Sequence, residues 1–129
     1  MVMVERLLSC DEKTTVTQLP IRKDNIFLRE GLLTVPGIIE SMAQTAAART
    51  GWLMKVKPGG ENKKAPIGVI GSVKNFRLHF LPSEGMELTT TIAVQLEVMQ
   101  ATVVSARVEA DGKLAAEAEL QIFLTETGS

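Results

Sequence analysis

The chain has 129 residues, of which 45% are hydrophobic, and its 14 basic and 15 acidic residues leave a formal net charge of −1. This length suffices for one hydrophobic core and predicts a single domain over residues 1–129. The near balance of charge and the few aromatic side chains argue against nucleic-acid binding. No apolar run approaches the roughly 20 residues that cross a bilayer, so we expect no membrane insertion.

Cysteine and histidine each occur once, as Cys10 and His79. One cysteine cannot form an internal disulfide, and one cysteine with one histidine cannot supply a zinc site, so the sequence predicts no bound metal. Met1–Leu8 lacks the basic-then-apolar pattern of a secretion leader. Together with the lone cysteine, this favours a cytoplasmic protein.

The first half of the chain predicts strand material followed by one long helix. Residues 4–28 read weakly as one or two strands, with Asp11–Lys13 as a turn. The helix is predicted from Pro36 to Leu53, because proline suits a first helical position and the Ala-rich segment Ala43–Ala48 favours helix. At 100° per residue one half of this helix is apolar; it contains Ile38, Ile39, Met42, Ala43, Ala46 and Ala47.

The segment after the helix predicts a loop and then an irregular strand. Lys57–Lys64 is rich in glycine and lysine, which is typical of a mobile, solvated loop. Inward positions are odd from Ile67 to Val73 but even from Phe76 to Phe80, so we expect a β-bulge near Lys74-Asn75. Pro82–Gly85 then predicts a turn.

Three further strands with a period of two are predicted at the C-terminal end. Their inward positions are even-numbered, over 88–98, 104–108 and 114–124. Asp111-Gly112 is a hairpin signal. Because the inward positions of both flanking strands are even, the sequence predicts a three-residue loop, 111–113, that pairs Val108 with Ala116. The same argument predicts a three-residue connection over Met99–Ala101.

One helix and several antiparallel strands predict an α+β fold. A single helix cannot cover both faces of such a sheet, so we expect the sheet to curl around the helix and an open face to pack on a second subunit. The sequence therefore predicts a dimer.

Glu40 stands out at the margin of the apolar half of the helix, beside Ala47 and one turn before Gln44. It allows two interpretations. It is either a first-turn acid that favours the helix dipole and reaches water, or a carboxylate at the edge of a dry cleft that serves acid–base catalysis. The residues alone leave both open.

The segment Pro36–Gln44 reads Pro-Gly-Ile-Ile-Glu-Ser-Met-Ala-Gln. It resembles the central-helix motif of the hot-dog-fold 3-hydroxyacyl-(acyl carrier protein) dehydratases. It is most similar to the dehydratase-like proteins of aryl-polyene and flexirubin pigment clusters. The resemblance extends over most of the chain and implies a hot-dog fold, in which a curved antiparallel sheet wraps one long central helix.

The resemblance also implies a site. Glu40 would be the catalytic acid that assists loss of the 3-hydroxyl group, and Gly37, Gln44 and Gly71 would lie at the substrate. A backbone N–H of the strand that contains Gly71 would hold the thioester carbonyl. The substrates implied are acyl carrier protein or coenzyme A thioesters, with no cofactor.

The chain departs from the family at the histidine that removes the C2 proton. Asn25–Gly31 stands at that place without a histidine, and His79 falls at an outward strand position. Three functions stay open. In the first, the chain is a dehydratase with altered chemistry on Glu40. In the second, it is the non-catalytic partner of a histidine-bearing hot-dog subunit. In the third, it is a thioesterase that needs one carboxylate and no histidine. The dimer is correspondingly a homodimer or a heterodimer.

Overall fold

The computed structural model describes residues 6–56, 66–99 and 101–126, with side-chain surroundings for 6–49, 70–99 and 101–123. The elements in chain order are β1 (Arg6–Cys10), β2 (Thr14–Pro20), β3 (Leu28–Arg29), β4 (Leu32–Leu33), α1 (Val35–Val56), β5 (Pro66–Leu78), β6 (Glu87–Val98), β7 (Ala101–Ala110) and β8 (Lys113–Glu126). The predicted order of early strands, one long helix and four later strands is confirmed.

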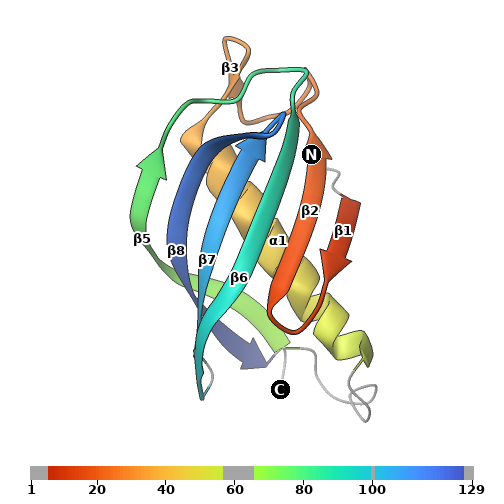
Figure 1. Cartoon of the computed structure of the whole chain (residues 1–129), viewed down its shortest axis with the longest axis vertical. Coiled ribbons are helices and arrows are strands. Elements are labelled where there is room, and N and C mark those ends of the chain that lie inside the picture. The colour runs from red at the N-terminus through yellow and green to blue at the C-terminus, as the bar shows by residue number, and fades with distance from the viewer. Residues whose placement is uncertain (1–5, 57–65, 100, 127–129) are drawn as a thin grey trace.

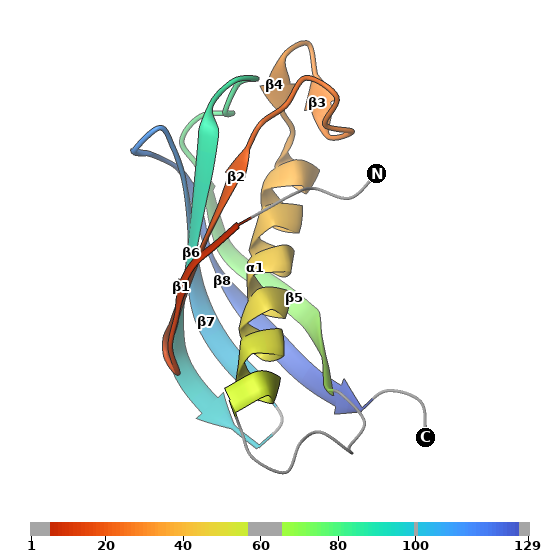
Figure 2. The ribbon, with the colours of Figure 1, turned by 90° about the vertical axis from the view of Figure 1, so that its right-hand side faces the viewer.

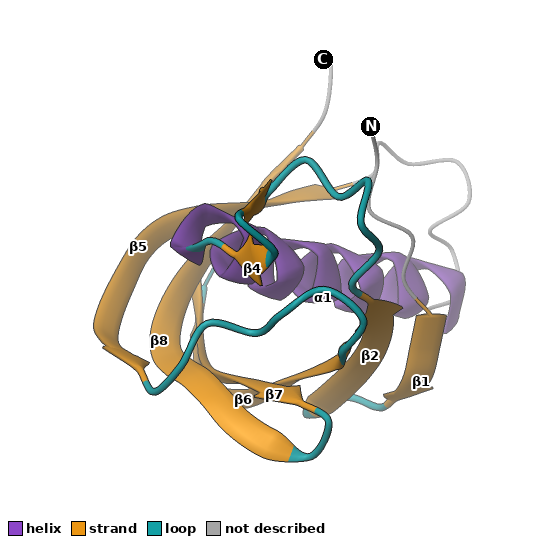
Figure 3. Cartoon of the chain, turned by 90° about the horizontal axis from the view of Figure 1, so that it is seen from above, coloured by secondary structure: helices purple, strands orange, loops and turns teal. Residues whose placement is uncertain are grey.

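The long strands form one antiparallel sheet that curves around α1. Its strand order is β1-β2-β6-β7-β8-β5, and β3 and β4 form a separate two-stranded hairpin. Figures 1 and 2 show α1 lying along one side of this sheet, and Figure 3 shows the sheet curling around it. This is the predicted α+β hot-dog architecture. The core between helix and sheet contains Leu33, Ile38, Met42, Leu88, Ile92, Val104, Val108 and Leu120.

The helix begins where Thr34 anchors it to the preceding segment. The carbonyl of Thr34 accepts the first helical hydrogen bond, from Ile38 N at 3.0 Å, while its hydroxyl donates to the carbonyl of Phe27 at 2.7 Å. The observed helix therefore begins at Val35, one residue before the predicted start, and it ends at Val56, beyond the predicted end at Leu53.

The face of α1 that packs on the sheet differs from the predicted apolar half. Its buried positions include Ser41, Thr45 and Arg49 beside the apolar residues Ile38 and Met42. Of the alanines expected there, Ala46 is buried, Ala43 is half-buried and Ala47 is exposed. The prediction was right for Ile38, Met42 and Ala46 but wrong for Ala47. It also left out the polar members of the buried face, because hydrophobicity alone cannot show that polar side chains find hydrogen-bond partners inside the sheet.

The β7–β8 hairpin confirms the predicted pairing and corrects the predicted loop. Val108 pairs with Ala116, as expected, but the loop is only two residues long. Asp111 and Gly112 have φ of 49° and 84°, and two positive φ angles are what a type I′ hairpin turn requires. The shared parity is restored by a bulge at Ala115 instead of a longer loop.

The β6–β7 connection departs from its prediction in the same way. Val98 pairs with Ala101, so the expected three-residue connection is wrong, and a bulge at Gln95 shifts the register of β6. Because a bulge reverses which side chains point inward, Leu96 and Val98 are exposed instead of buried.

The irregularity predicted in β5 is confirmed. The register shifts between Lys74 and Arg77, where Asn75 has a φ of 55°, and it shifts a second time at Gly71. The predicted turn at Pro82–Gly85 is also confirmed, since Gly85 has a φ of 93°. The predicted loop Lys57–Lys64 lies outside the described residues.

Candidate functional site

Glu40 and Gln44 form a hydrogen-bonded pair on α1. The Gln44 side-chain amide donates from Nε2 to Glu40 Oε2 at 3.0 Å, and both side chains are half-buried. They are four residues apart, which places them one above the other on the helix surface. The structure thus brings together two of the predicted site residues, and the amide holds one oxygen of the carboxylate in place.

Glu40 lies outside the first turn of the helix. Because α1 begins at Val35, Glu40 is its sixth residue. The helix dipole acts within the first turn, so it gives little reason for an acid at this position. This weakens the interpretation of Glu40 as a first-turn acid.

The pair lies on the side of α1 that is turned away from the sheet. At 100° per residue, the buried positions Ile38, Met42 and Thr45 point in a direction roughly opposite to Glu40 and Gln44. From the sequence, Glu40 was expected at the margin of the apolar half of the helix. Because the observed buried face is rotated relative to that half, Glu40 lies on the side away from it. Figure 3 shows that the sheet curves around α1, from β1 and β2 at one end to β5 at the other.

The sheet-facing side of α1 carries a row of hydroxyl pairs that the sequence reasoning missed. Ser41 Oγ and Thr90 Oγ1 are 2.7 Å apart, as are Thr45 Oγ1 and Thr17 Oγ1. Thr45 also donates to the carbonyl of Ser41 at 2.8 Å, so its hydroxyl accepts from Thr17. The signal was available as the spacing Ser41-x-x-x-Thr45 on the helix, opposite threonines on predicted strands.

Arg49 continues this polar row by one more helical turn. Its side chain is only 9% exposed, and its Nη2 donates to the carbonyl of Glu12 at 3.1 Å. The same nitrogen lies 3.7 Å from Glu97 Oε2, which makes an ion pair with the sheet. These contacts fix the helix to the sheet and leave its other side to Glu40 and Gln44.

Gly37 lies where the segment before the helix packs tightly on α1. A Cβ at this position would lie 2.6 Å from Phe27 Cβ and 2.7 Å from Leu33 Cδ1. This chain's own side chains therefore fill the space beside Gly37, which gives the glycine a packing reason. The role of Gly37 at the substrate stays a prediction.

Gly71 lies at the second register shift of β5, beneath an aromatic ring. A Cβ there would be 2.2 Å from Cε2 of Phe123 on β8. The absence of a side chain thus lets the Phe123 ring lie over the backbone of β5. The expected role of this strand in holding a thioester carbonyl also stays a prediction.

The segment that stands in place of the family histidine is a compact turn. The side-chain oxygen of Asn25 accepts from Phe27 N at 2.8 Å, and its carbonyl accepts from Leu28 N at 3.1 Å. This arrangement directs Phe27 against Gly37 at the start of the helix. It supplies no proton-accepting ring beside Glu40.

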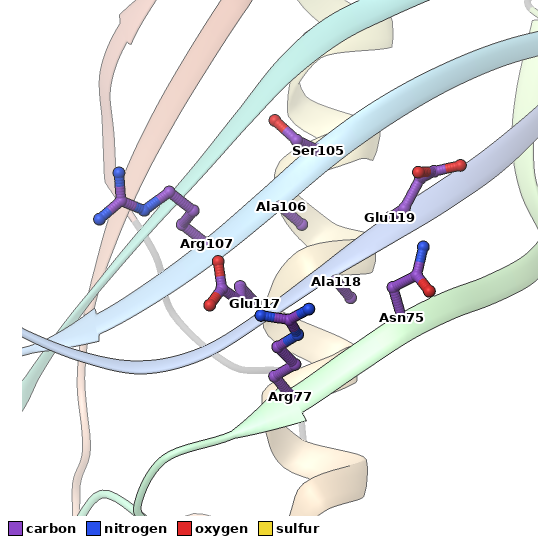
Figure 4. A pocket seen from close by; sticks show the side chains of 8 residues that line it. All are labelled: Asn75, Arg77, Ser105, Ala106, Arg107, Glu117, Ala118 and Glu119. Carbon is purple, nitrogen blue, oxygen red and sulfur yellow. The ribbon is translucent and has the colours of Figure 1, made fainter.

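His79 is exposed, as predicted from its outward position. Its Nε2 is 3.1 Å from Glu117 Oε2 on β8. Glu117 lines a shallow hollow of about 430 Å³ on the outer face of the sheet, together with Asn75, Arg77, Ser105, Arg107 and Glu119. Figure 4 shows these side chains in front of the sheet, with α1 behind it. His79 and Glu40 therefore lie on opposite sides of the sheet and cannot act as a pair within one chain.

Among the described residues, no group of three or more histidine, cysteine or carboxylate side chains is placed to hold a metal ion. In the same part of the chain, no helix combines the length and the apolar character needed to cross a membrane.

The comparisons with solved structures define the fold class. The chain is similar to a chain of the dehydratase heterocomplex ApeI:P from Xenorhabdus doucetiae, with 19% identity, a TM-score of 0.83, and coverage of 98% of this chain and 84% of that one. It is also similar to a hypothetical thioesterase from Streptococcus pneumoniae solved with coenzyme A, with 12% identity, a TM-score of 0.76, and coverage of 98% and 92%. A third similar structure is smu.793 from Streptococcus mutans bound to acetyl CoA, with 12% identity, a TM-score of 0.74, and coverage of 100% and 94%. The fold is thus that of the hot-dog proteins.

The family follows from the sequence. The model of the ApeP-like family, described as ApeP dehydratase, matches residues 1–128. The chain therefore belongs to the ApeP-like dehydratase family, in agreement with the resemblance found in its helix. No match was found among curated protein sequences.

Proposed function

We propose that this chain is one subunit of a 3-hydroxyacyl-thioester dehydratase and that a second hot-dog chain supplies the catalytic histidine. The observation that carries this proposal is the position of the Glu40–Gln44 pair on the side of α1 away from the sheet, while His79 contacts Glu117 on the outer face of the sheet. Dehydration needs a base for the C2 proton and an acid for the 3-hydroxyl group. On the side of α1 away from the sheet, this chain supplies the acid, Glu40, but not the base.

The partner has a suitable place to bind. β5 is an edge strand of 13 residues, whereas the other edge strand, β1, has five. A long edge presents a row of backbone donors and acceptors to which another chain can add a strand. A similar chain, at 19% identity, comes from a structure described as a dehydratase heterocomplex. We therefore place the histidine-bearing subunit along β5.

Each group has a defined step in the proposed reaction. The partner's histidine takes the proton from C2, the C2–C3 double bond forms, and the 3-hydroxyl group leaves with a proton from the Glu40 carboxyl group as water. Gln44 orients Glu40 through the 3.0 Å hydrogen bond. The acyl group reaches this site as a thioester of acyl carrier protein or of coenzyme A.

A reconstitution experiment tests the proposal. Mass spectrometry would follow 3-hydroxyacyl and 2-enoyl thioesters, on acyl carrier protein and on coenzyme A, with this chain alone, a histidine-bearing hot-dog subunit alone, and both together. We expect rapid interconversion only with both. In the mixture, Glu40→Gln should lower the rate by about 100-fold or more, because a positioned acid contributes about that much.

The matched control is Glu84→Gln, which changes an exposed carboxylate in the turn after β5 and should leave the rate unchanged. Full activity of this chain alone, or of the mixture with Glu40→Gln, would contradict the proposal.

A thioesterase is the second candidate. The observation in its favour is that Gln44 orients the Glu40 carboxylate without any histidine, and one carboxylate can activate water or attack a thioester. The same incubations test it. Free thiol released by this chain alone, and lost in Glu40→Gln, would replace the dehydratase proposal by this one.

A further inference from the structure

The buried face of α1 and the apolar half of its sequence point in different directions. The buried positions are Ile38, Ser41, Met42, Thr45, Ala46 and Arg49. The apolar half consists of Ile38, Ile39, Met42, Ala43, Ala46 and Ala47. At 100° per residue, the centres of the two sets lie roughly 80° apart around the helix axis. Burial of apolar area alone would therefore favour a rotation of α1 that brings Ile39 and Ala43 toward the sheet.

Polar contacts on one flank of the buried face oppose that rotation. Ser41 and Thr45 each share a hydrogen bond of 2.7 Å with a threonine of the sheet, Thr90 on β6 and Thr17 on β2. Arg49 follows one turn later and donates to the β1–β2 turn. We call Ser41, Thr45 and Arg49 the polar row. Its members are four residues apart, so they hold α1 over about 12 Å of its length. A rotation toward the apolar half would carry the polar row away from the sheet and break these bonds.

Stability alone does not require polar side chains in this row. A pair of apolar side chains of the same shape is nearly as stabilising as a buried hydrogen-bonded pair, or more so. Arg49 also has a buried Nε without a hydrogen-bond partner among the described residues, which is unfavourable for the fold. A buried polar contact does, however, select one arrangement of packed elements over its competitors. The competitor here is the rotation that the apolar half favours.

The rotation of α1 decides where the Glu40 carboxylate lies. Glu40 and Gln44 are roughly opposite to the centre of the buried face. Side chains end about 5–6 Å from the helix axis, so a rotation of only about 10° moves the carboxylate by about 1 Å. A displacement of about 1 Å at a reacting group lowers a rate by about 100-fold.

We propose that the polar row fixes the rotation of α1 against the preference of its apolar half and thereby positions Glu40 for the reaction. Ser41, Thr45 and Arg49 are positioning residues, because they face the sheet and act on Glu40 only through the helix. The consequence for turnover rests on the proposed dehydratase function. The rotation itself is a property of this chain alone.

Cysteine reactivity on the two flanks of α1 measures the rotation in the isolated chain. In a Cys10→Ser background, Ala43→Cys and Ala48→Cys report on opposite flanks, and both alanines are half-buried. Thr17→Val with Thr45→Val removes one hydroxyl pair and keeps the shape of both side chains. We expect this change to slow alkylation severalfold at position 43 and to speed it severalfold at position 48. Any other pattern, such as faster alkylation at both positions through general loosening, would overturn the proposal.

Turnover in the reconstituted mixture tests the consequence for Glu40. The double valine variant should unfold near the wild-type midpoint, yet its kcat should fall by about 10-fold or more with little change in KM. The matched control is Thr17→Ser with Thr45→Ser, which keeps both hydroxyl groups and loses two methyl groups. It should unfold earlier than the wild type and keep the wild-type kcat. A purely structural role predicts the reverse, with turnover that follows stability, and that result would overturn the proposal.

The second hydroxyl pair keeps the test decisive if the double valine variant folds poorly. Ser41→Ala with Thr90→Val removes that pair, and we expect the same opposite changes in alkylation and the same fall in kcat. A wild-type mixture without turnover would contradict the proposed function. The alkylation rates would then still decide whether the polar row fixes the rotation of α1.

Discussion

The two sides of helix α1 are built in different ways. On the side toward the sheet, Ile38 and Met42 are fully buried, and Ser41, Thr45 and Arg49 each contact the sheet or the β1–β2 turn. On the opposite side, Glu40 and Gln44 contact each other, and the residues one turn further on are alanines. The chain thus completes the first side by itself, whereas the second side has one carboxylate held by an amide, and small side chains beside them.

This difference separates what holds the fold from what serves a function. Burial and matched hydroxyl pairs explain the first side without reference to any ligand. The second side gains little for the fold from an ordered carboxylate, because an i,i+4 pair on a helix contributes only about 0.2–0.5 kcal/mol. Single substitutions on the two sides should therefore have opposite profiles, with loss of stability on one and loss of turnover on the other.

The largest effect on stability is expected from Met42→Ala. Met42 is completely buried between α1 and the sheet, so removing its side chain should lower the free energy of unfolding by about 2–5 kcal/mol. Denaturant unfolding measures this. Ile39→Ala is the control, because Ile39 is only half-buried and should cost clearly less. An equal loss in the free energy of unfolding for Met42→Ala and Ile39→Ala would contradict the proposed difference between the two sides of α1.

Gly37→Ala should have the next largest effect. The added methyl group would lie 2.6 Å from Phe27 Cβ, so the segment before the helix must shift, at a cost of about 1–3 kcal/mol. Thermal unfolding and turnover are measured on the same samples. Unchanged stability with lost substrate binding would show that Gly37 belongs to the site and not to the packing.

Thr45→Val tests the hydroxyl pairs inside the core. It leaves the buried hydroxyl of Thr17 without its partner at 2.7 Å, which should cost about 1–3 kcal/mol. Adding Thr17→Val removes the orphaned hydroxyl, so the double variant should lose less than the sum of the two single variants. Strict additivity in this double-mutant cycle would contradict the account of the paired row.

The smallest effect on stability is expected from Gln44→Ala. Losing its hydrogen bond to Glu40 should change the free energy of unfolding by less than about 0.5 kcal/mol. In the reconstituted mixture the same variant should slow dehydration, because Glu40 loses its orientation. A large loss of stability with unchanged turnover would assign Gln44 to the fold.

The sequence predicted the elements better than it predicted which side chains they bury. Period-two patterns and turn residues located every long strand. The even-numbered inward positions of β7 and β8 also showed correctly that one extra residue must lie between the paired positions of these two strands. They could not show whether that residue lies in a longer loop or in a bulge at Ala115, because both restore the same pairing. The bulge at Gln95 leaves no break in the apolar pattern, so the outward turn of Leu96 and Val98 was not predictable.

The candidate site was predictable in part. The helix motif located Glu40 and Gln44, and their spacing implied that they meet. The direction in which they point depends on which helix face packs on the sheet. That choice follows from hydroxyl and arginine partners that lie far apart in the sequence, such as Thr90 and Glu97. Hydrophobic patterning carries no information on such pairs.

The most direct test of the central claim is whether another chain covers the Glu40 side of α1. In a Cys10→Ser background, Gln44→Cys would be alkylated in the isolated chain and in the presence of the histidine-bearing hot-dog subunit, with Lys23→Cys in an exposed loop as the control. We predict that the partner slows alkylation at position 44 severalfold and leaves position 23 unchanged. Equal rates at position 44 with and without a bound partner would contradict the claim that the site is completed by a second subunit.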